Sequence, residues 1–276
     1  MSNAEQKDYW TAQTSWVSQQ EAMDQNLGPV LDLVLERAQL RPGQSVLDIG
    51  CGTGASLLAA ATHVGVNGHV EGVDISAPLL EFAKDRTADY AHISVREADA
   101  AADDLGGPYD AMISRFGVMF FADTTGAFAH IRRALKPGAQ LTFATWAPPP
   151  QNPYFMAPAQ AAQSVLGKMP KADRTLPGPF AMEDPERIIP MLSAAGLTEI
   201  ACDPVPLHLQ PSGSLADVAH LCLLIGPPAG AIRHFDADAD QIDAVHAAVM
   251  EALSPFETPQ GLRLPAVINL YTAIAP

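Results

Sequence analysis

The stretch from Val46 to Gly54, VLDIGCGTG, limits the possible folds more than any other part of the sequence. Its apolar start is typical of a buried strand, and it runs directly into three alternating glycines and a small-residue segment expected to be helical. Glycine permits a tight turn and lets a ligand approach the backbone closely. The first turn of the helix offers free N–H groups and a partial positive charge, which suit a carboxylate or a phosphate. The stretch therefore predicts a strand, a ligand-binding turn and a helix in succession.

The rest of the first half continues this alternation of strands and helices. With the strand of this stretch, at residues 45–49, strands are predicted at 69–74, 92–96, 109–114 and 141–146. Ser76 has the character of an N-cap, and Asp123 is expected to cap a helix that includes Leu135 and ends at Lys136-Pro137-Gly138. Such spacing predicts a parallel sheet with right-handed crossovers.

The second half is less regular, because 19 of the 24 prolines lie after Phe143. We expect helices at residues 185–195, 214–225 and 238–253, and strands at 198–209 and 262–274. The proline- and alanine-rich residues 150–180, together with parts of 214–253, are predicted to form a lid over the site. The pattern indicates a core sheet with two lid-forming insertions, one on either side of the sixth strand.

Composition bounds the kind of partner. Apolar residues make up 48% of the chain and charged residues 17%, so a core can form. The formal net charge of −15 disfavours nucleic acid and anionic membranes as partners. Cys51, Cys202 and Cys222 lack CxxC spacing, which fits a reducing compartment without a zinc site. With no signal-like start and no apolar run of 18 residues, we expect a cytoplasmic protein. We also expect no metal centre, because the sequence contains no cluster of metal ligands.

Asp74 supplies the second element of a nucleotide site. It ends the second predicted strand, 24 residues after Gly50, where an acid accepts hydrogen bonds from ribose hydroxyls. Gly50-x-Gly52-x-x-Ala55 also satisfies the dinucleotide pattern. The loop and the acid together predict an adenosine-type ligand and leave both a nicotinamide dinucleotide and S-adenosylmethionine open.

Four further features favour the second ligand. Asp48, just before the loop, can face the ammonium group of a bound amino acid, which a dinucleotide lacks. The segment EADA, residues 97–100, follows the third strand, where a carboxylate can accept from the adenine amino group. The fourth strand contains Asp110 and leads into residues 114–121, SRFGVMFF. The capped helix leads into LKPG, residues 135–138.

With VLDIGCGTG, GVDIS, EADA and LKPG, the sequence resembles the class I S-adenosylmethionine-dependent methyltransferases. Within them it is most similar to the branch that includes the ubiquinone and menaquinone C-methyltransferases. The resemblance covers residues 40–147 and extends more loosely to the N-terminal aromatic residues and to the start of the lid. It implies an α/β, Rossmann-like, seven-stranded, mostly parallel sheet with helices on both faces and lid insertions in the C-terminal half. The expected parts are an N-terminal helical cap (1–40), a cofactor-binding core (41–147), and remaining core strands with substrate-binding insertions (148–276).

The resemblance also implies site residues. The residues expected to bind S-adenosyl-L-methionine, and its product S-adenosyl-L-homocysteine, are Asp48, Gly50, Cys51, Gly52, Gly54, Asp74, Ile75, Asp99, Ala100 and Arg115. The aromatic residues expected to contact the methyl acceptor are Tyr9, Trp10, Phe116, Trp146 and Tyr154. No catalytic residue is assigned, because none of the eight histidines occupies a position that identifies a general base.

Several of these residues have a purely structural alternative. Asp48 is also placed to cap the neighbouring helix, and Asp99 to lie in a solvated acidic loop. Arg115 is equally suited to pairing with a carboxylate of this acidic protein. Tyr9 and Trp10 fit packing better than cofactor contact.

The predicted function is methyl transfer by in-line displacement to a small apolar or aromatic metabolite, by a monomer or homodimer. The acceptor atom (O, N, C or S) stays open. The alternatives are an NAD(P)-dependent oxidoreductase and a non-catalytic cofactor-binding protein of the same fold.

Overall fold

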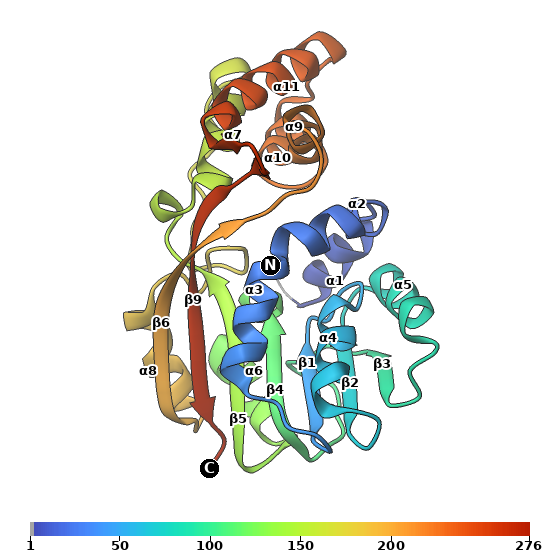
Figure 1. Cartoon of the computed structure of the whole chain (residues 1–276). Helices are drawn as coiled ribbons and strands as arrows, with labels where there is room; N and C mark the ends of the chain where they lie inside the picture. The colour runs from blue at the N-terminus through green and yellow to red at the C-terminus, as the bar shows by residue number, and fades with distance from the viewer. Residues whose placement is uncertain (1–2) are drawn as a thin grey trace.

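The computed structural model describes residues 3–276, which fold around one seven-stranded sheet in the order β3-β2-β1-β4-β5-β9-β6 (Figure 1). The strands are β1 (Ser45–Ile49), β2 (His69–Asp74), β3 (Ile93–Glu97), β4 (Tyr109–Arg115), β5 (Leu135–Trp146), β6 (Thr198–Leu209) and β9 (Leu264–Ile274). β1 to β5 run parallel, and β9 is antiparallel to both β5 and β6. The predicted seven-stranded, mostly parallel α/β sheet is confirmed.

Helices cover both faces of the sheet, as Figure 1 shows. α3 (Gln20–Ala38), α4 (Ala55–Val64) and α5 (Ala77–Thr87) lie on one face, and α6 (Thr124–Arg132) and α8 (Pro185–Ala194) lie on the other. α4 is a short run of small and aliphatic residues whose inner side is fully buried against β1 and β2. The core is therefore a helix–sheet–helix sandwich.

Two short N-terminal helices, α1 (Asn3–Ala12) and α2 (Ser15–Ser18), lie beside α5 near the carboxyl ends of the parallel strands (Figure 1). Ser76 is the N-cap residue of α5, as predicted, but its hydroxyl makes no capping hydrogen bond. It donates instead to the backbone oxygen of Trp10, 3.2 Å away, and so ties α1 to the core.

The remaining helices gather beyond the carboxyl end of the sheet (Figure 1). They are α7 (Pro153–Leu166), α9 (Leu215–Leu224), α10 (Pro227–Phe235) and α11 (Ala239–Leu253). α7 packs against α10 and α11, and the whole group is carried by β6 and β9, whose pairing continues to Leu209 and Leu264, past the last β5–β9 pair. The short elements are η1 (Gly117–Phe120), η2 (Pro149–Gln151), η3 (Ser254–Phe256), β7 (Glu257–Thr258) and β8 (Gly261–Leu262).

The helix before β5 was predicted wrongly at its end. α6 stops at Arg132, and Leu135 already belongs to β5, opposite Tyr109. The next paired residues are Ala111 and Gln140, so the intervening residues of β5, Lys136-Pro137-Gly138-Ala139, form an irregularity in the strand. The physical reason is Pro137, which lacks an N–H group and disfavours helical backbone in the residue before it.

Most of the helices and strands predicted for the second half of the chain are present in the structure. The predicted strand at residues 198–209 is β6, and the predicted helices at 185–195, 214–225 and 238–253 are α8, α9 and α11. Ser214 and Asp238 both form capping boxes, with Asp217 and Gln241 as their partners. α10 was not predicted, although Gly226 followed by two prolines is a typical helix start.

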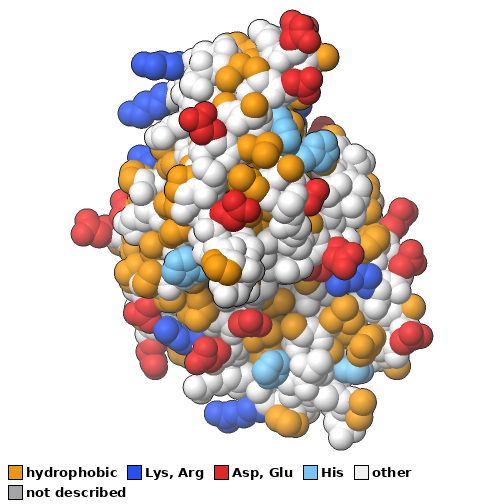
Figure 2. Space-filling view, turned by 45° about the horizontal axis from the view of Figure 1, so that its top comes forward, with side chains coloured by type: hydrophobic (Ala, Val, Ile, Leu, Met, Phe, Trp, Pro, Cys, Tyr) orange, Lys and Arg blue, Asp and Glu red, His pale blue; other side chains and the backbone are white. Residues whose placement is uncertain are grey.

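Acidic side chains outnumber basic ones on the face drawn in Figure 2, in keeping with the net charge of −15. Within residues 3–276, no single helix has both the length and the apolar character needed to cross a membrane. The bent pair α9 and α10, at 53° to one another, passes that test of length and composition only when the two are taken together.

Candidate functional site

The glycine loop lies between β1 and α4, at the carboxyl edge of the sheet. Gly50, Gly52 and Gly54 all have positive φ angles of 70°, 54° and 88°, which side-chain-bearing residues rarely adopt. The backbone N–H groups of Gly50 and Cys51 donate to the oxygen of Val73 on β2, at 2.8 and 3.2 Å. The loop therefore needs glycine at all three positions and is fastened to the neighbouring strand.

Cys51 turns its thiol away from the loop. The side chain is buried, and a Cβ on Gly72 of β2 would lie 2.9 Å from its sulfur. Burial raises the pKa of this thiol well above its usual value, with the Asp74 and Asp48 charges acting in the same direction. Cys51 can therefore offer a ligand its backbone only.

Asp74 holds the loop from the other side. Its carboxylate accepts from the N–H of Gly52 and from the N–H of Ser76, both at 2.9 Å. Burial raises the pKa of Asp74, and these backbone hydrogen bonds oppose the rise. The sequence placed this acid beside the glycines, and the structure brings the two together.

Asp48 is completely buried at the end of β1. One carboxylate oxygen accepts from the hydroxyl of Ser56 in α4, and the other, Oδ1, has no hydrogen-bond partner among residues 3–276. Burial raises the pKa of Asp48 to about 7, although the Ser56 hydrogen bond and the Arg115 charge lower it. Its partner is a side chain rather than the helix backbone, so the capping alternative is not what the structure shows.

Arg115 ends β4 and is largely but not fully buried, with 15% of its side chain exposed. Its Nη2 lies 3.8 Å from Asp24 of α3, whose carboxylate is shared with Arg86 at 2.9 Å. Nη1 is buried without a partner in the described part of the chain. Burial lowers the pKa of Arg115, while Asp24 and Asp48 raise it. The predicted carboxylate pairing exists, and it leaves one donor group unused.

Asp99 lies in the loop after β3 and faces α1. Its Oδ2 accepts from the amide of Asn3 at 2.7 Å, and its Oδ1 from the backbone N–H of Ala101 at 2.9 Å. Ala100 is buried beside it, and Ile75 is half-buried at the end of β2. Asp99, which is expected to bind an adenine amino group, thus already accepts a hydrogen bond from the side-chain amide of Asn3 in α1.

The aromatic residues predicted to contact an acceptor fall into two groups. Around Trp10, the rings of Tyr9, Trp16 and Phe120 lie edge-on at centroid distances of 5.5, 5.9 and 5.0 Å. The second group comprises Phe116, Trp146, Tyr154, Phe155 and Phe180. In it the Phe116 and Trp146 rings stack at 4.3 Å, and Trp146 stacks on Tyr154 at 5.9 Å. We call this second group the aromatic wall.

Two residues near these side chains were missed by sequence reasoning, Gln6 and Asn26, and Asp24 fell within the resemblance but was given no role. The amide of Asn26 donates to the hydroxyl of Tyr154 at 3.2 Å, and its Oδ1 has no partner among the described residues. Both polar atoms of the Gln6 side chain are buried and equally without partners there. Asn26 was detectable, because it lies three residues after Met23 and four before Val30 on the apolar stripe of α3.

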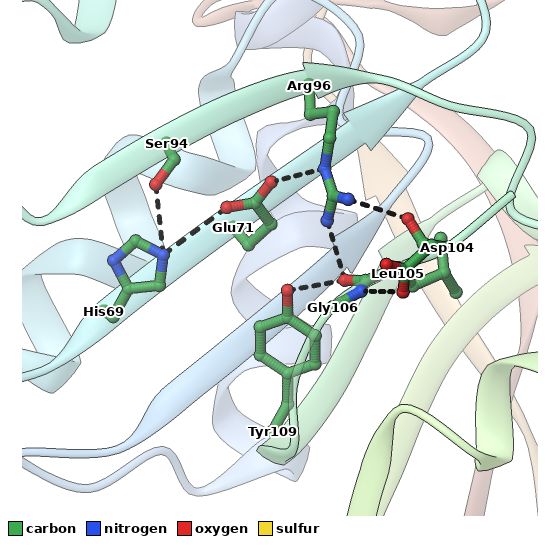
Figure 3. A network of polar contacts seen from close by, with 8 residues as sticks. All are labelled: His69, Glu71, Ser94, Arg96, Asp104, Leu105, Gly106 and Tyr109. Carbon is green, nitrogen blue, oxygen red and sulfur yellow. Dashed lines mark hydrogen bonds and ion pairs between the residues drawn. The ribbon is translucent and has the colours of Figure 1, made fainter.

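The polar network of Figure 3 lies elsewhere and serves the fold. Arg96 of β3 contacts Glu71 at 3.0 Å and donates to the backbone oxygens of Asp104 and Leu105, both at 2.7 Å. Tyr109 donates to the same Leu105 oxygen. These bonds pin the connection between β3 and β4, and none involves a predicted site residue.

The chain matches known methyltransferases. Residues 46–138 match the family described as "Methyltransferase domain". Nocamycin O-methyltransferase of Saccharothrix syringae is 29% identical over 184 residues, which are 62% of this chain and 65% of the relative. 2-Phytyl-1,4-naphtoquinone methyltransferase of Trichormus variabilis is 34% identical over 113 residues, or 40% of this chain and 49% of the relative. The chain thus spans less than two thirds of each of these relatives.

A solved structure shares the fold. Phosphoethanolamine N-methyltransferase 2 of Haemonchus contortus, crystallised with S-adenosyl-L-methionine, superposes with a TM-score of 0.54 at 18% identity. The match covers 90% of this chain and 52% of that protein. The predicted resemblance to methyltransferases is confirmed: residues 46–138 match the methyltransferase domain, and the chain shares its fold with a methyltransferase crystallised with S-adenosyl-L-methionine.

Proposed function

We propose that this protein transfers a methyl group from S-adenosyl-L-methionine to a small, flat, largely apolar metabolite. The observation that carries the proposal is the set of unused polar atoms around the glycine loop. Asp48 Oδ1 and Arg115 Nη1 are buried without partners among the described residues. Burying an unpaired polar group costs about 1–3 kcal/mol, so these atoms are suited to a ligand that pairs with them.

The two groups match an amino acid end. The Asp48 carboxylate fits an ammonium group, and the free Nη1 of Arg115 fits a carboxylate. Asp74, beside Gly52, fits the ribose hydroxyls, and Asp99 with the backbone of Ala100 fits the adenine edge. The expected cofactor is therefore one in which an adenosine and an amino acid are joined.

When bound, S-adenosylmethionine supplies a methyl group on a positively charged sulfur, which leaves without needing a proton. The protein's part is to orient the acceptor behind the methyl carbon and to exclude water. We assign the orientation to the aromatic wall, because Phe116 follows Arg115 directly and Trp146 stacks on it. Water exclusion falls to α1 on one side and to α7 and α9–α11, the proposed lid, on the other.

Other expectations remain part of the proposal. The division into a cap (1–40), a core (41–147) and a substrate-binding remainder (148–276) stays a prediction. So do a cytoplasmic location, a monomer or homodimer, and the absence of nucleic acid, membrane and metal partners. The net charge of −15 supports the first two of these absences.

Calorimetry with S-adenosylhomocysteine and NADH tests the proposal. We expect the first to bind with a Kd near 1 μM, about −8 kcal/mol, and NADH not to bind. Asp74→Ala removes the ribose acceptor and should weaken binding at least tenfold. Asp85→Ala is the matched control, because it removes an exposed carboxylate of α5 to which no role in binding is assigned. NADH binding without binding of the homocysteine compound would instead favour the oxidoreductase alternative, and binding without turnover of any acceptor the non-catalytic one.

A further inference from the structure

Asn26 and Tyr154 meet at the junction of four elements around the aromatic wall. Tyr154 comes from α7 and stacks on Trp146 at the end of β5, which stacks on Phe116 after β4. Asn26 comes from α3, the helix whose Asp24 reaches Arg115. The pair is therefore linked through packed rings to the carboxyl edge of the sheet, where the glycine loop lies.

The hydrogen bond between the two residues fixes what each can still offer. Asn26 donates through Nδ2 to the Tyr154 hydroxyl oxygen at 3.2 Å, so the hydroxyl proton is left free to donate. Asn26 Oδ1 is an acceptor with no partner among residues 3–276, on a residue with 0% of its surface exposed. One donor and one acceptor thus lie side by side, the acceptor on the fully buried Asn26 and the donor on the half-buried Tyr154.

Neither residue is suited to remove a proton from a substrate. Burial raises the pKa of Tyr154 far above its ordinary value, with a contribution from the Cys222 thiol, and only the Asn26 hydrogen bond opposes it. The Cys222 thiol is itself raised to a pKa of about 12 by burial. At neutral pH the Tyr154 hydroxyl and the Cys222 thiol therefore both stay protonated. Asn26 and Tyr154 can form hydrogen bonds with a ligand but cannot take a proton from it.

We propose that Asn26 and Tyr154 are the specificity-determining pair of the acceptor pocket, and that they select a flat conjugated ring carrying a hydrogen-bond donor and acceptor on adjacent positions. A hydroxyl beside a ring carbonyl has this pattern: the hydroxyl donates to Asn26 Oδ1 and the carbonyl accepts from Tyr154. The ring packs along Trp146 and Phe116. This inference rests on the proposed function, which makes the aromatic wall the acceptor side of the site.

The probe is 3-hydroxychromone, a small flat ring with a hydroxyl next to a carbonyl. We expect it to bind the full chain saturated with S-adenosylhomocysteine at least tenfold more tightly than chromone, which lacks the hydroxyl. 3-Methoxychromone keeps the ring and the acceptor but loses the donor, and should bind no better than chromone. A preference of about tenfold or more is expected because chromone leaves the buried Asn26 acceptor unpaired.

Two variants assign the discrimination to the pair. Tyr154→Phe keeps the stacked ring and Asn26→Leu keeps the volume, and each should reduce the preference for 3-hydroxychromone to threefold or less. Tyr109→Phe is the control, because it removes a buried phenol that donates to Leu105, away from the site. Circular dichroism and the affinity for S-adenosylhomocysteine, expected to be unchanged, show that each variant is folded.

The outcomes separate this inference from the proposed function. If S-adenosylhomocysteine fails to bind the unmodified chain, the proposed function is wrong. If it binds and the chain does not distinguish 3-hydroxychromone from chromone, the pair is not a selector. A preference that persists in folded Tyr154→Phe and Asn26→Leu proteins overturns the assignment in the same way.

Discussion

A side chain on Gly50 would place its first carbon 2.5 Å from the Cα of Gly117. The reverse also holds, since a Cβ on Gly117 would lie 2.4 Å from the backbone oxygen of Ile49. The glycine loop and the turn after β4 are therefore packed backbone against backbone. This contact joins the part of the site assigned to the cofactor with the residues that lead into the aromatic wall.

Gly50→Ala should disrupt this contact. Two backbones must separate to admit the methyl group, and the positive φ adds strain, so we expect a loss of stability of about 2–4 kcal/mol. Gly52→Ala is the matched control, because its Cβ would meet nothing within 4 Å and only the strain of φ +54° remains, about 1–2 kcal/mol. Urea unfolding measures both. Equal losses in the two variants would show that crowding at Gly117 has no influence.

Asp48→Asn should change how stability depends on pH. Burial raises the pKa of Asp48 in the folded chain to about 7, above its ordinary value of 3.8. The folded state therefore favours the protonated carboxyl. The contribution of this group to the free energy of unfolding is fully present below the pKa of the unfolded chain and is lost as pH rises through 7. Asn has no such loss, so the variant should gain about 3 kcal/mol on the wild type between pH 5 and pH 8.

The control for that measurement is Asp110→Asn. Burial opposes ionisation of Asp110, but hydrogen bonds from Lys136 and Ser45 hold its pKa below the usual value. The stability that the ionised Asp110 contributes is lost only as pH falls through that lowered pKa. The difference in free energy of unfolding between Asp110→Asn and the wild type should therefore not change from pH 5 to pH 8. A flat difference for Asp48→Asn as well would contradict the raised pKa.

Binding of S-adenosylhomocysteine should release a proton near pH 6. At that pH the buried Asp48 carboxyl is mostly protonated in the free protein, and an ammonium group placed opposite it lowers its pKa. Calorimetry in buffers of different ionisation enthalpy counts the protons released per ligand bound. We expect close to one at pH 6 and almost none at pH 8.5. Proton uptake, or no change between these pH values, would place the ammonium away from Asp48.

Asn3→Ala should tighten the binding of S-adenosylhomocysteine. The Asn3 amide occupies Asp99 Oδ2 at 2.7 Å, and the adenine amino group is expected to compete for the same oxygen. Removing a hydrogen bond of this kind changes the free energy by about 1 kcal/mol, which corresponds to about a fivefold lower Kd. Lys7→Ala is the control, since Lys7 lies in the same helix as Asn3 but pairs with Glu97 of β3 and not with Asp99. Weaker binding by Asn3→Ala would mean that Asn3 supports the adenine site.

The half of the site that depends on local patterns was predictable. The glycine loop, Asp48 and Asp74 follow one another within two strands, so their proximity follows from the strand–turn–helix pattern alone. The end of α6 was predicted too late because the apolar spacing of Ile131 and Leu135 continues past the point where Pro137 stops the helix. There the proline should have been given more weight than the periodicity.

The half that depends on distant pairings was not predictable. Asn26 and Tyr154 are separated by 128 residues, and the two rings of Trp10 and Phe120 by more than a hundred. Sequence spacing says nothing about which helix comes to lie over the sheet edge. For the same reason the five predicted acceptor residues could not be sorted into the Trp10 group and the aromatic wall.

The position of β9 has a consequence for the order in which the site is assembled during synthesis. β9 is made after the other six strands, yet it lies inside the sheet between β5 and β6. Asn152, at the start of α7, donates to Ala147 and accepts from the N–H of Val267 in β9, so the helix that bears Tyr154 is fixed in place by this late strand. The residues that hold the glycine loop, from β1 to Gly117, are all made early in synthesis, whereas the strand that holds the helix bearing Tyr154 is made last.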